Sequence, residues 1–223
     1  MSNRGYYLKK YLEAIDLEHE NILNEFRFTS DELSTYNELL NNLITTNSNS
    51  SSSSTEKGKV LEDIVSFIME KSIIFSVCRN VRTSTNEIDL LVQLNYRGIA
   101  LIKDGIIPQY PPFLCECKNY YKTISVTWVG KFYSLLKTSK NNFGILFSYN
   151  GFSGKGWSNA NGLAKKIYLT DQSKIIDFSL EDFRSLANKS FLEILNEKIF
   201  NLENDVCITQ FISNHPNEQA FDI

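Results

Sequence analysis

The sequence predicts an α/β fold in which a mixed β-sheet is covered by helices and preceded by a helical N-terminal extension. Two observations support this prediction. From residue 60 onward, segments with helical apolar spacing alternate with short runs rich in β-branched residues, in the order α-β-β-β-α-β-(α)-β. In addition, 42% of the 223 residues are hydrophobic and 13% are aromatic, which is enough to form a packed core.

The N-terminal part differs from the rest in composition. Residues 6–26 and 31–44 carry apolar side chains at helical spacing, and Ser30 or Asp31 is a plausible N-cap of the second helix. No apolar residue follows until position 60, and this Ser/Asn-rich run predicts a flexible linker. The predicted division is a helical extension at 1–45, a linker at 46–58 and a main domain at 59–223.

The main domain contains five segments expected to be strands, each short and rich in apolar residues. They are SIIFSVCRNV at 72–81, EIDLLVQL at 87–94, FLCECKN at 113–119, FGILFS at 143–148 and KIIDFS at 174–179. The fourth is apolar throughout, which suits a strand buried on both faces. Helices are expected at 60–71, 125–140, 161–169 and 180–200.

Composition narrows the chemistry that the chain can perform. The cysteines form no C-x-x-C array and there are only two histidines, so neither a zinc site nor a histidine-based triad is expected. Reduced thiols and the lack of an apolar leader indicate a cytoplasmic protein, and no run approaches the roughly 20 apolar residues of a membrane span. The net charge of −3 gives no overall basic signature, although binding to nucleic acid depends on the local patch that meets phosphate.

Carboxylates and a lysine gather in two of the predicted strands. In FLCECKN, strand alternation places Glu116 and Lys118 on one face and the two cysteines on the other. In EIDLLVQL, Asp89 is an acid within an otherwise apolar strand. Because an isolated buried carboxylate is costly, Asp89 is expected to have a cation, a metal or hydrogen-bond donors beside it.

If the two strands are neighbours, Asp89 and Glu116 can converge on one divalent ion, and hard oxygen ligands favour Mg²⁺, with Mn²⁺ as a substitute. The backbone carbonyl of Cys117 could complete the protein share of the ligands. Lys118 would then orient the attacking water and offset charge on a phosphate. Glu62, at the edge of the helix at 60–71, could hold a second ion or a water molecule.

These residues resemble the PD-(D/E)xK phosphodiesterases, the restriction-endonuclease-like superfamily, and in particular its Mrr-like restriction endonuclease branch. The likeness lies in the order of the motifs over about residues 56 to 180, since a lone ExK tripeptide carries almost no information. The matching positions are Gly58 before Glu62, EID at 87–89, ECKN at 116–119, GILFS at 144–148 and Gly151-Phe152. One departure is the insertion at 96–112, which is expected to form an elongated hairpin or a separate insertion.

The resemblance implies a metal-dependent endonuclease that hydrolyses DNA phosphodiester bonds, in a bacterial restriction or antiphage setting. Its catalytic residues would be Glu62, Asp89, Glu116 and Lys118. Of these, Asp89 and Glu116 would bind the metal together with the Cys117 carbonyl, and Glu62 is a further candidate ligand. The expected partners are DNA and either a second copy of the chain or another protein of a defence system, with no membrane.

Other residues and other functions stay open at this level. Lys122, Lys131 and Lys155 are candidate DNA-binding cations, and Tyr120, Tyr121 and Trp128 either stack on bases or pack against the core. One alternative function is a catalytically silent nuclease-fold module for nucleic-acid binding or complex assembly. Another is a structure-specific repair or junction nuclease, which no residue pattern separates from a restriction enzyme.

Overall fold

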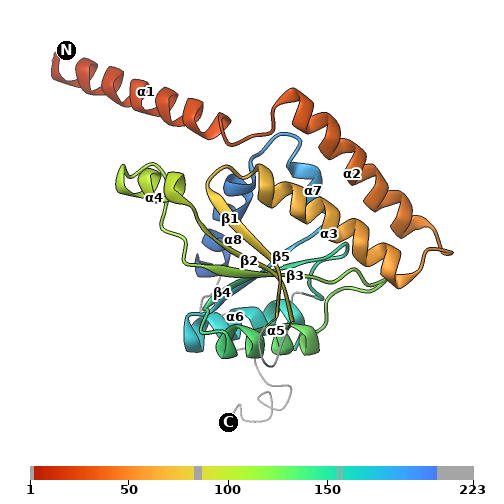
Figure 1. The fold of residues 1–223 in the computed structure, drawn as a ribbon. Coiled ribbons are helices and arrows are strands. Elements are labelled where there is room, and N and C mark those ends of the chain that lie inside the picture. The colour runs from red at the N-terminus through yellow and green to blue at the C-terminus, as the bar shows by residue number, and fades with distance from the viewer. Residues whose placement is uncertain (1–2, 83–86, 155, 157, 205–223) are drawn as a thin grey trace, which may run out of the picture.

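The structure is a computed structural model that describes residues 3–82, 87–154, 156 and 158–204. Its helices and strands are arranged around one sheet, and helix α1 projects from the body (Figure 1). In chain order they are α1 Asn3–Asn24, α2 Ser30–Ser48, α3 Ser54–Lys71, β1 Phe75–Arg82, β2 Glu87–Leu94, α4 Tyr96–Lys103, β3 Phe113–Cys117, α5 Val126–Thr138, β4 Phe143–Phe147, α6 Ala160–Asp171, β5 Lys174–Phe178, α7 Leu180–Ser185 and α8 Phe191–Asn204. Among the described residues, no helix is long and apolar enough to span a membrane.

The sheet is mixed, as the sequence predicts. Its strands follow the chain in the order β1-β2-β3-β4-β5, and β2 is antiparallel to both of its neighbours, β1 and β3. Strands β3, β4 and β5 run parallel, with α5 and α6 as the crossover helices. Such helices are needed because parallel strands cannot be joined by a tight turn. The α/β fold class is therefore confirmed.

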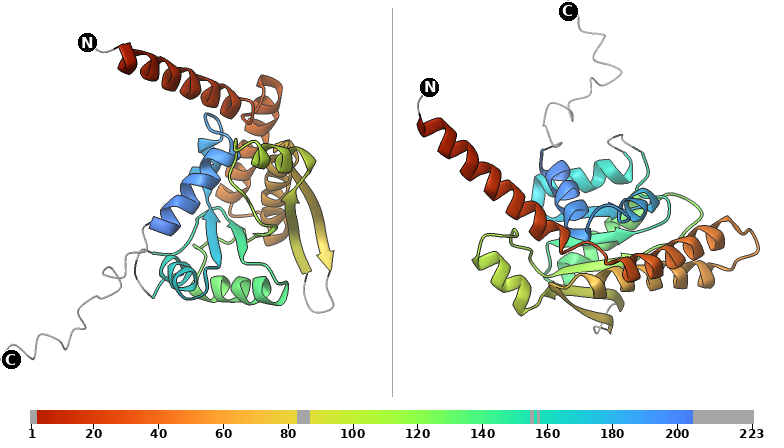
Figure 2. Two further views of the ribbon diagram at one scale, coloured as in Figure 1. Left: turned by 90° about the vertical axis from the view of Figure 1, so that its left-hand side faces the viewer. Right: turned by 90° about the horizontal axis from the view of Figure 1, so that it is seen from above.

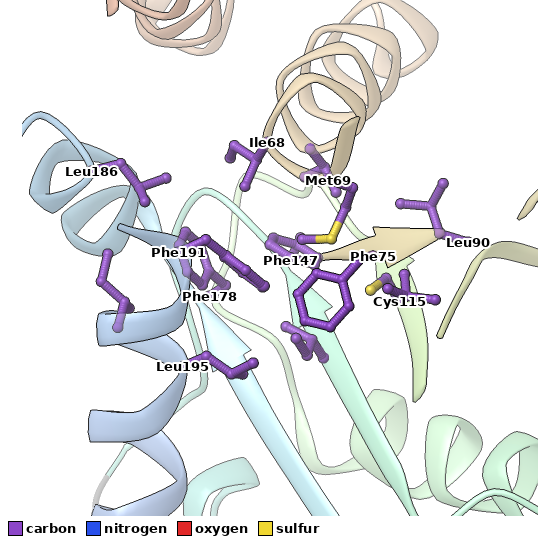
Figure 3. Close-up of a cluster of buried hydrophobic side chains, with 14 of the residues drawn as sticks. Ile68, Met69, Phe75, Leu90, Cys115, Phe147, Phe178, Leu186, Phe191 and Leu195 are labelled. Carbon is purple, nitrogen blue, oxygen red and sulfur yellow. The ribbon is translucent and has the colours of Figure 1, made fainter. Parts of the chain in front are cut away.

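Two hydrophobic clusters fill the two faces of the sheet. The larger lies between the sheet and α2, α3, α7 and α8, and Figure 3 shows part of it around Phe147 and Phe178, whose ring centroids are 5.1 Å apart. The smaller lies between the sheet and α5 and α6. Strand alternation divides the side chains between them: in β3, Cys115 belongs to the larger cluster and Leu114 to the smaller.

The Ser/Asn-rich run does not form the linker that its composition predicts. Helix α2 continues to Ser48, and α3 begins at Ser54 after a short turn. Ser53 caps α3, because its hydroxyl accepts the Glu56 N–H while the Glu56 carboxylate accepts the Ser53 N–H. Serines disfavour helix interiors but are strong N-caps, so a composition typical of linkers here builds a helix start.

Helix α2 is part of the main hydrophobic core. Its N-cap is Thr29, one residue before the positions expected from the sequence, and Glu32 completes the capping box. Tyr36, Leu40 and Leu43 are buried in the larger cluster, and the Tyr36 hydroxyl donates a hydrogen bond to the Phe183 carbonyl oxygen. The core around the sheet thus extends into the segment that composition assigns to an N-terminal extension.

The insertion contains a helix that the sequence analysis did not predict. Helix α4 is capped by the Asn95 side chain, which accepts hydrogen bonds from the N–H groups of Arg97 and Gly98. Its chain leaves β2 at Leu94 and returns at Phe113, which pairs with Val92. The insertion joins the end of β2 to the start of β3. Asp89 lies near the start of β2 and Glu116 near the end of β3, so the insertion is at the other end of these strands from both acids.

Substituting Leu43 by alanine tests whether α2 belongs to the core. The side chain is 0% exposed, so its truncation should lower the free energy of unfolding by about 2–5 kcal/mol. Urea denaturation measures this change, and Asn41→Ala on the exposed face of the same helix is the matched control. Equal stability of the two variants would mean that α2 is a detachable extension.

Candidate active site

The candidate site lies where β2 and β3 diverge. Their ladder pairs Leu90 with Cys115, and no pair beyond these two residues continues it among the described residues. One position further, the Asp89 carboxylate takes the place of a strand partner, because its Oδ2 accepts the Cys117 N–H at 2.7 Å. Asp89 therefore lies in the wedge between two strands, with a backbone donor beside it, as expected for a buried acid.

The regular alternation of β2 changes at this point. Leu90 lies in the larger cluster, but Ile88, two residues earlier, lies in the smaller one on the other face of the sheet. Side chains two apart in a regular strand share a face. Regular alternation was expected from the sequence. In the structure, the apolar side chains before and after Asp89 instead lie on opposite faces of the sheet.

Glu116 and Lys118 share a face of β3 and form an ion pair through Glu116 Oε1. The two cysteines between and before them face the opposite cluster, as alternation predicts. The second carboxylate oxygen, Glu116 Oε2, is buried and has no hydrogen-bond partner among the described residues. A buried acceptor without a partner is costly and is characteristic of a site that receives a ligand or ion.

Glu62 reaches the same wedge from α3. Leu61 and Val65 of this helix are buried in the core, which directs Glu62 toward the edge of the sheet. A pocket of about 80 Å³ separates α3 from the strands there. It is lined by Glu62, Asp63, Ser66, Arg79, Asp89, Leu90 and Cys117.

Asn119 fixes the end of β3 to the start of α3. Its side-chain amide donates a hydrogen bond to the Lys57 carbonyl oxygen, and the residue is buried. Glu62 lies five positions after Lys57 on α3, so this contact sets the position of the helix that carries Glu62 relative to Glu116 and Lys118. The asparagine of the ECKN motif therefore has a positioning role that the sequence analysis did not assign.

The carboxylates of the site act on one another electrostatically. Burial raises the pKa of Glu116, and the negative charge of Asp89 raises it further, against the opposing effect of Lys118. Burial and the charge of Asp89 likewise raise the pKa of Glu62. Three acids near one lysine form a region of excess negative charge, which a cation would neutralise.

Lys118 remains a cation in this environment. Burial alone would lower its pKa, but the hydrogen bond and the charge of Glu116, together with the charge of Asp89, outweigh burial and raise the pKa of the lysine. A charged ammonium can stabilise negative charge but cannot accept a proton. The geometry thus suits an electrostatic role and not that of a general base.

Aromatic and basic residues form a rim next to Lys118. Tyr120 stacks on Trp128, with ring centroids 5.4 Å apart, and Lys118 Nζ lies 5.4 Å from the Trp128 ring. Lys131 Nζ lies 4.6 Å from the same ring. Lys122 is exposed on the segment that follows β3, and Lys155 falls outside the described residues.

Arg79, Asp63 and Ser66 line the pocket without having been predicted from the sequence. Arg79 lies in β1 and its guanidinium pairs with Glu70 of α3. In the sequence, these side chains occur within ordinary amphipathic patterns, so no local signal distinguishes them. Asp63 and Ser66 lie beside Glu62 on α3 itself, whereas only the packing of α3 against β1 brings Arg79 to Glu62.

The cysteine side chains do not take part as thiolates. Burial raises the pKa of both Cys115 and Cys117 well above the ordinary thiol value, and the charge of Asp89 adds to this effect. Neutral thiols are poor nucleophiles and poor metal ligands. A metal ion at this site would therefore be held by oxygen donors.

The donor set fits a hard divalent cation. Glu116 Oε2 has no partner, and the carboxylates of Glu62, Asp89 and Glu116 leave an excess of negative charge around it. In the described part of the chain, no three Asp, Glu, His or Cys side chains are already grouped closely enough to hold a metal. The predicted ligands are two carboxylates and a backbone carbonyl, a set that does not require such a group.

The comparisons with known proteins agree with this architecture. A family model for restriction endonucleases (Mrr_cat) matches residues 54–179, which is more than half of the chain. The match starts at the first residue of α3, ends just after β5 and contains the four predicted catalytic residues. A search of curated proteins and a search of solved structures each gave no match. The chain belongs to the restriction endonuclease family, and its catalytic domain is of the nuclease type.

Replacing Glu116 by glutamine should stabilise the metal-free protein increasingly as the pH rises. Because the pKa of Glu116 is raised in the folded state, the folded protein keeps a proton that the unfolded chain releases near the ordinary value of 4.5. Wild type therefore loses stability as the pH rises from 4.5 toward the raised folded value, and the glutamine variant avoids this loss. Urea unfolding with a chelator at several pH values measures the difference.

Glu38→Gln provides the control, because Glu38 is an exposed glutamate of α2 that does not belong to the site. The same pH trend in this control would show that the effect does not come from Glu116. A Glu116→Gln variant that is less stable than wild type at neutral pH would show instead that the ion pair with Lys118 outweighs the cost of burial.

Proposed function

We propose that this protein is a magnesium-dependent endonuclease that hydrolyses DNA phosphodiester bonds, acting in bacterial restriction or antiphage defence. The observation that carries the proposal is the meeting of Glu62, Asp89, Glu116 and Lys118 at the divergence of β2 and β3. The defence setting is supported by membership in the restriction endonuclease family alone.

Asp89, Glu116 and the Cys117 carbonyl would hold Mg²⁺, or Mn²⁺ in its place, and Glu62 is a further candidate ligand. Such an ion supplies Lewis-acid stabilisation of charge on the phosphate oxygens. The protein contributes a buried acceptor that lacks a partner, Glu116 Oε2, and a carboxylate whose position is fixed by the Cys117 N–H. Both features prepare the site before a ligand arrives, which limits reorganisation on binding.

In the proposed reaction, a water oxygen attacks the phosphorus atom and the bond to one ester oxygen breaks, leaving a phosphate monoester and a hydroxyl. Lys118, kept positively charged by Glu116 and Asp89, offsets the negative charge that grows on the phosphate. The raised pKa of Glu62 makes its carboxylate a stronger base toward a proton of the attacking water.

The rim beside Lys118 is proposed to contact DNA. Lys131 and Lys122 are exposed cations that can bind backbone phosphates. Lys155, which lies outside the described residues, is a third candidate from the sequence. The stacked pair of Tyr120 and Trp128 offers an aromatic surface to a base or sugar. A local basic and aromatic rim accounts for DNA binding by a chain whose net charge is −3.

Plasmid cleavage with Mg²⁺ tests the catalytic assignment. Asp89→Asn keeps an acceptor for the Cys117 N–H but removes the charge, and Lys118→Ala removes the cation. Each should lower the cleavage rate about 10²–10³-fold, as loss of one electrostatic contact typically does. Asp63→Asn, in the same pocket, and Lys137→Ala, whose lysine is paired with Asp171 of α6, are matched controls expected to retain rates within a few-fold.

Wild type that leaves supercoiled, linear, methylated and single-stranded DNA intact would contradict this assignment and favour a catalytically silent module for binding or assembly. Cleavage confined to branched DNA would instead favour a structure-specific repair or junction nuclease. If Asp63→Asn lowered the cleavage rate as much as Asp89→Asn, the assignment of Asp89 as the metal-binding aspartate of the pocket would be contradicted.

DNA affinity in the Asp89→Asn background tests the rim. Trp128→Ala should raise the dissociation constant about tenfold, and Lys131→Ala should weaken binding and reduce the dependence of log K on log salt by about one. The control is Lys137→Ala, because this lysine of the same helix is paired with Asp171. Fluorescence anisotropy at several salt concentrations measures all three, and unchanged affinity in the first two variants would place the DNA elsewhere.

A further inference from the structure

Helix α1 extends away from the rest of the protein. It contains 22 residues, which corresponds to a length of about 33 Å. Figure 1 and the left view of Figure 2 show it projecting from the body, and it has no extensive contact with another helix or strand of the described residues. The segment behind it is held in place, since Arg27 pairs with Glu193 of α8 at 2.7 Å. A fixed base therefore presents a long helix that is not packed into the body of the protein as the described residues show it.

One face of α1 is apolar and exposed. Leu8 is 59% exposed and Tyr11 is 64% exposed, and both lie on the same side of the helix at a spacing of three. At the a/d spacing of paired helices, the positions from 8 to 22 are Leu8, Tyr11, Ile15, Glu18 and Ile22, so all but one are apolar. A helix of this length is only marginally stable when its apolar stripe is exposed to water. Burial of the stripe against a partner would stabilise the helix.

The charges along α1 are unequally distributed. Lys9 and Lys10 lie in its first half, whereas Glu20 and Glu25 lie at and just after its end. A second α1 running in the opposite direction would bring the lysines of each helix to the glutamates of the other. A parallel partner would instead place like charges together. The antiparallel arrangement also opposes the two helix dipoles, which is favourable.

We propose that α1 pairs in an antiparallel manner with α1 of a second copy of this chain, through the stripe of Leu8, Tyr11 and Ile22, to form a homodimer. The pairing is isologous: the same surface of each copy meets itself about a twofold axis. If the proposed function holds, the dimer carries two catalytic sites, one available for each DNA strand.

Sedimentation equilibrium on the full chain tests the proposal. Wild type should have close to twice the chain mass of 25.6 kDa at micromolar concentration. The double variant Leu8→Glu/Tyr11→Glu should be monomeric, with a melting temperature close to that of wild type because α1 lies outside both hydrophobic clusters. The matched control is Leu17→Glu, since Leu17 is 61% exposed but lies half a turn away from Leu8 on the helix, and this variant should remain dimeric.

Charge exchange tests the orientation. Lys9→Glu/Lys10→Glu and Glu20→Lys/Glu25→Lys should each weaken the dimer about tenfold or more, whereas the combination of all four changes should restore it. In a parallel dimer like charges would oppose each other in every one of these variants, so no such loss and recovery would occur. That result would overturn the antiparallel arrangement.

A wild type that is monomeric up to about 100 µM, well above the range of specific dimers, would overturn the proposal. So would a Leu8→Glu/Tyr11→Glu variant that stays dimeric, since another surface would then form the interface. These outcomes depend on mass alone and are independent of catalysis. If wild type cleaves plasmid, the monomeric variant should still nick it but should yield less linear product at early times.

Discussion

The divergence of β2 and β3 is the feature on which the geometry of the site depends. The antiparallel ladder pairs Leu90 with Cys115, and one residue further a side-chain carboxylate replaces a backbone acceptor by receiving the Cys117 N–H at 2.7 Å. The parallel pairing of β3 with β4 continues to Cys117 and Phe147. Strand β3 thus stays paired with β4, and β2 stays paired with β1 while it separates from β3. The opening between β2 and β3 is lined by acids. Without the hydrogen bond to Asp89, the Cys117 N–H would need another acceptor in a buried position.

The energetic cost of this arrangement is concentrated in Glu116. Its carboxylate is partly shielded from water, faces Asp89, and has one oxygen with no hydrogen-bond partner among the described residues. Lys118 compensates for part of that charge, and the surrounding apolar clusters hold the strand in place. A folded protein tolerates such a local loss of stability when the same groups bind a cation or substrate.

The residues that support the site come from a larger part of the chain than the family match. The match covers residues 54–179, which hold the five strands and the predicted catalytic residues. The larger hydrophobic cluster, however, also includes α2 on one side and α7 and α8 on the other. These helices cover the face of the sheet opposite α5 and α6, so the sheet would expose its apolar side chains without them. Helix α1 differs from them because it contributes nothing to either cluster.

The sequence alone determined which motifs lie on which strands, and that Glu116 and Lys118 share a face. Side chains alternate between the two faces of a strand, so residues two apart point to the same side. It also located the helix that carries Glu62 through the apolar spacing of Leu61 and Val65. Prediction from local sequence was wrong for two segments between the expected helices and strands. Serines around residue 53 cap α3 although their composition is that of a linker, and the insertion after Leu94 forms α4.

Only the tertiary structure decided how the acids meet. The change of face between Ile88 and Leu90, the contact of Asn119 with Lys57, and the arrival of Arg79 in the pocket all depend on how α3 packs against the sheet. Local periodicity cannot encode these contacts, because each joins residues that are far apart in the chain or departs from a regular strand. The sequence therefore specified which side chains carry the chemistry, and long-range packing specified the distances and burial that set their charges.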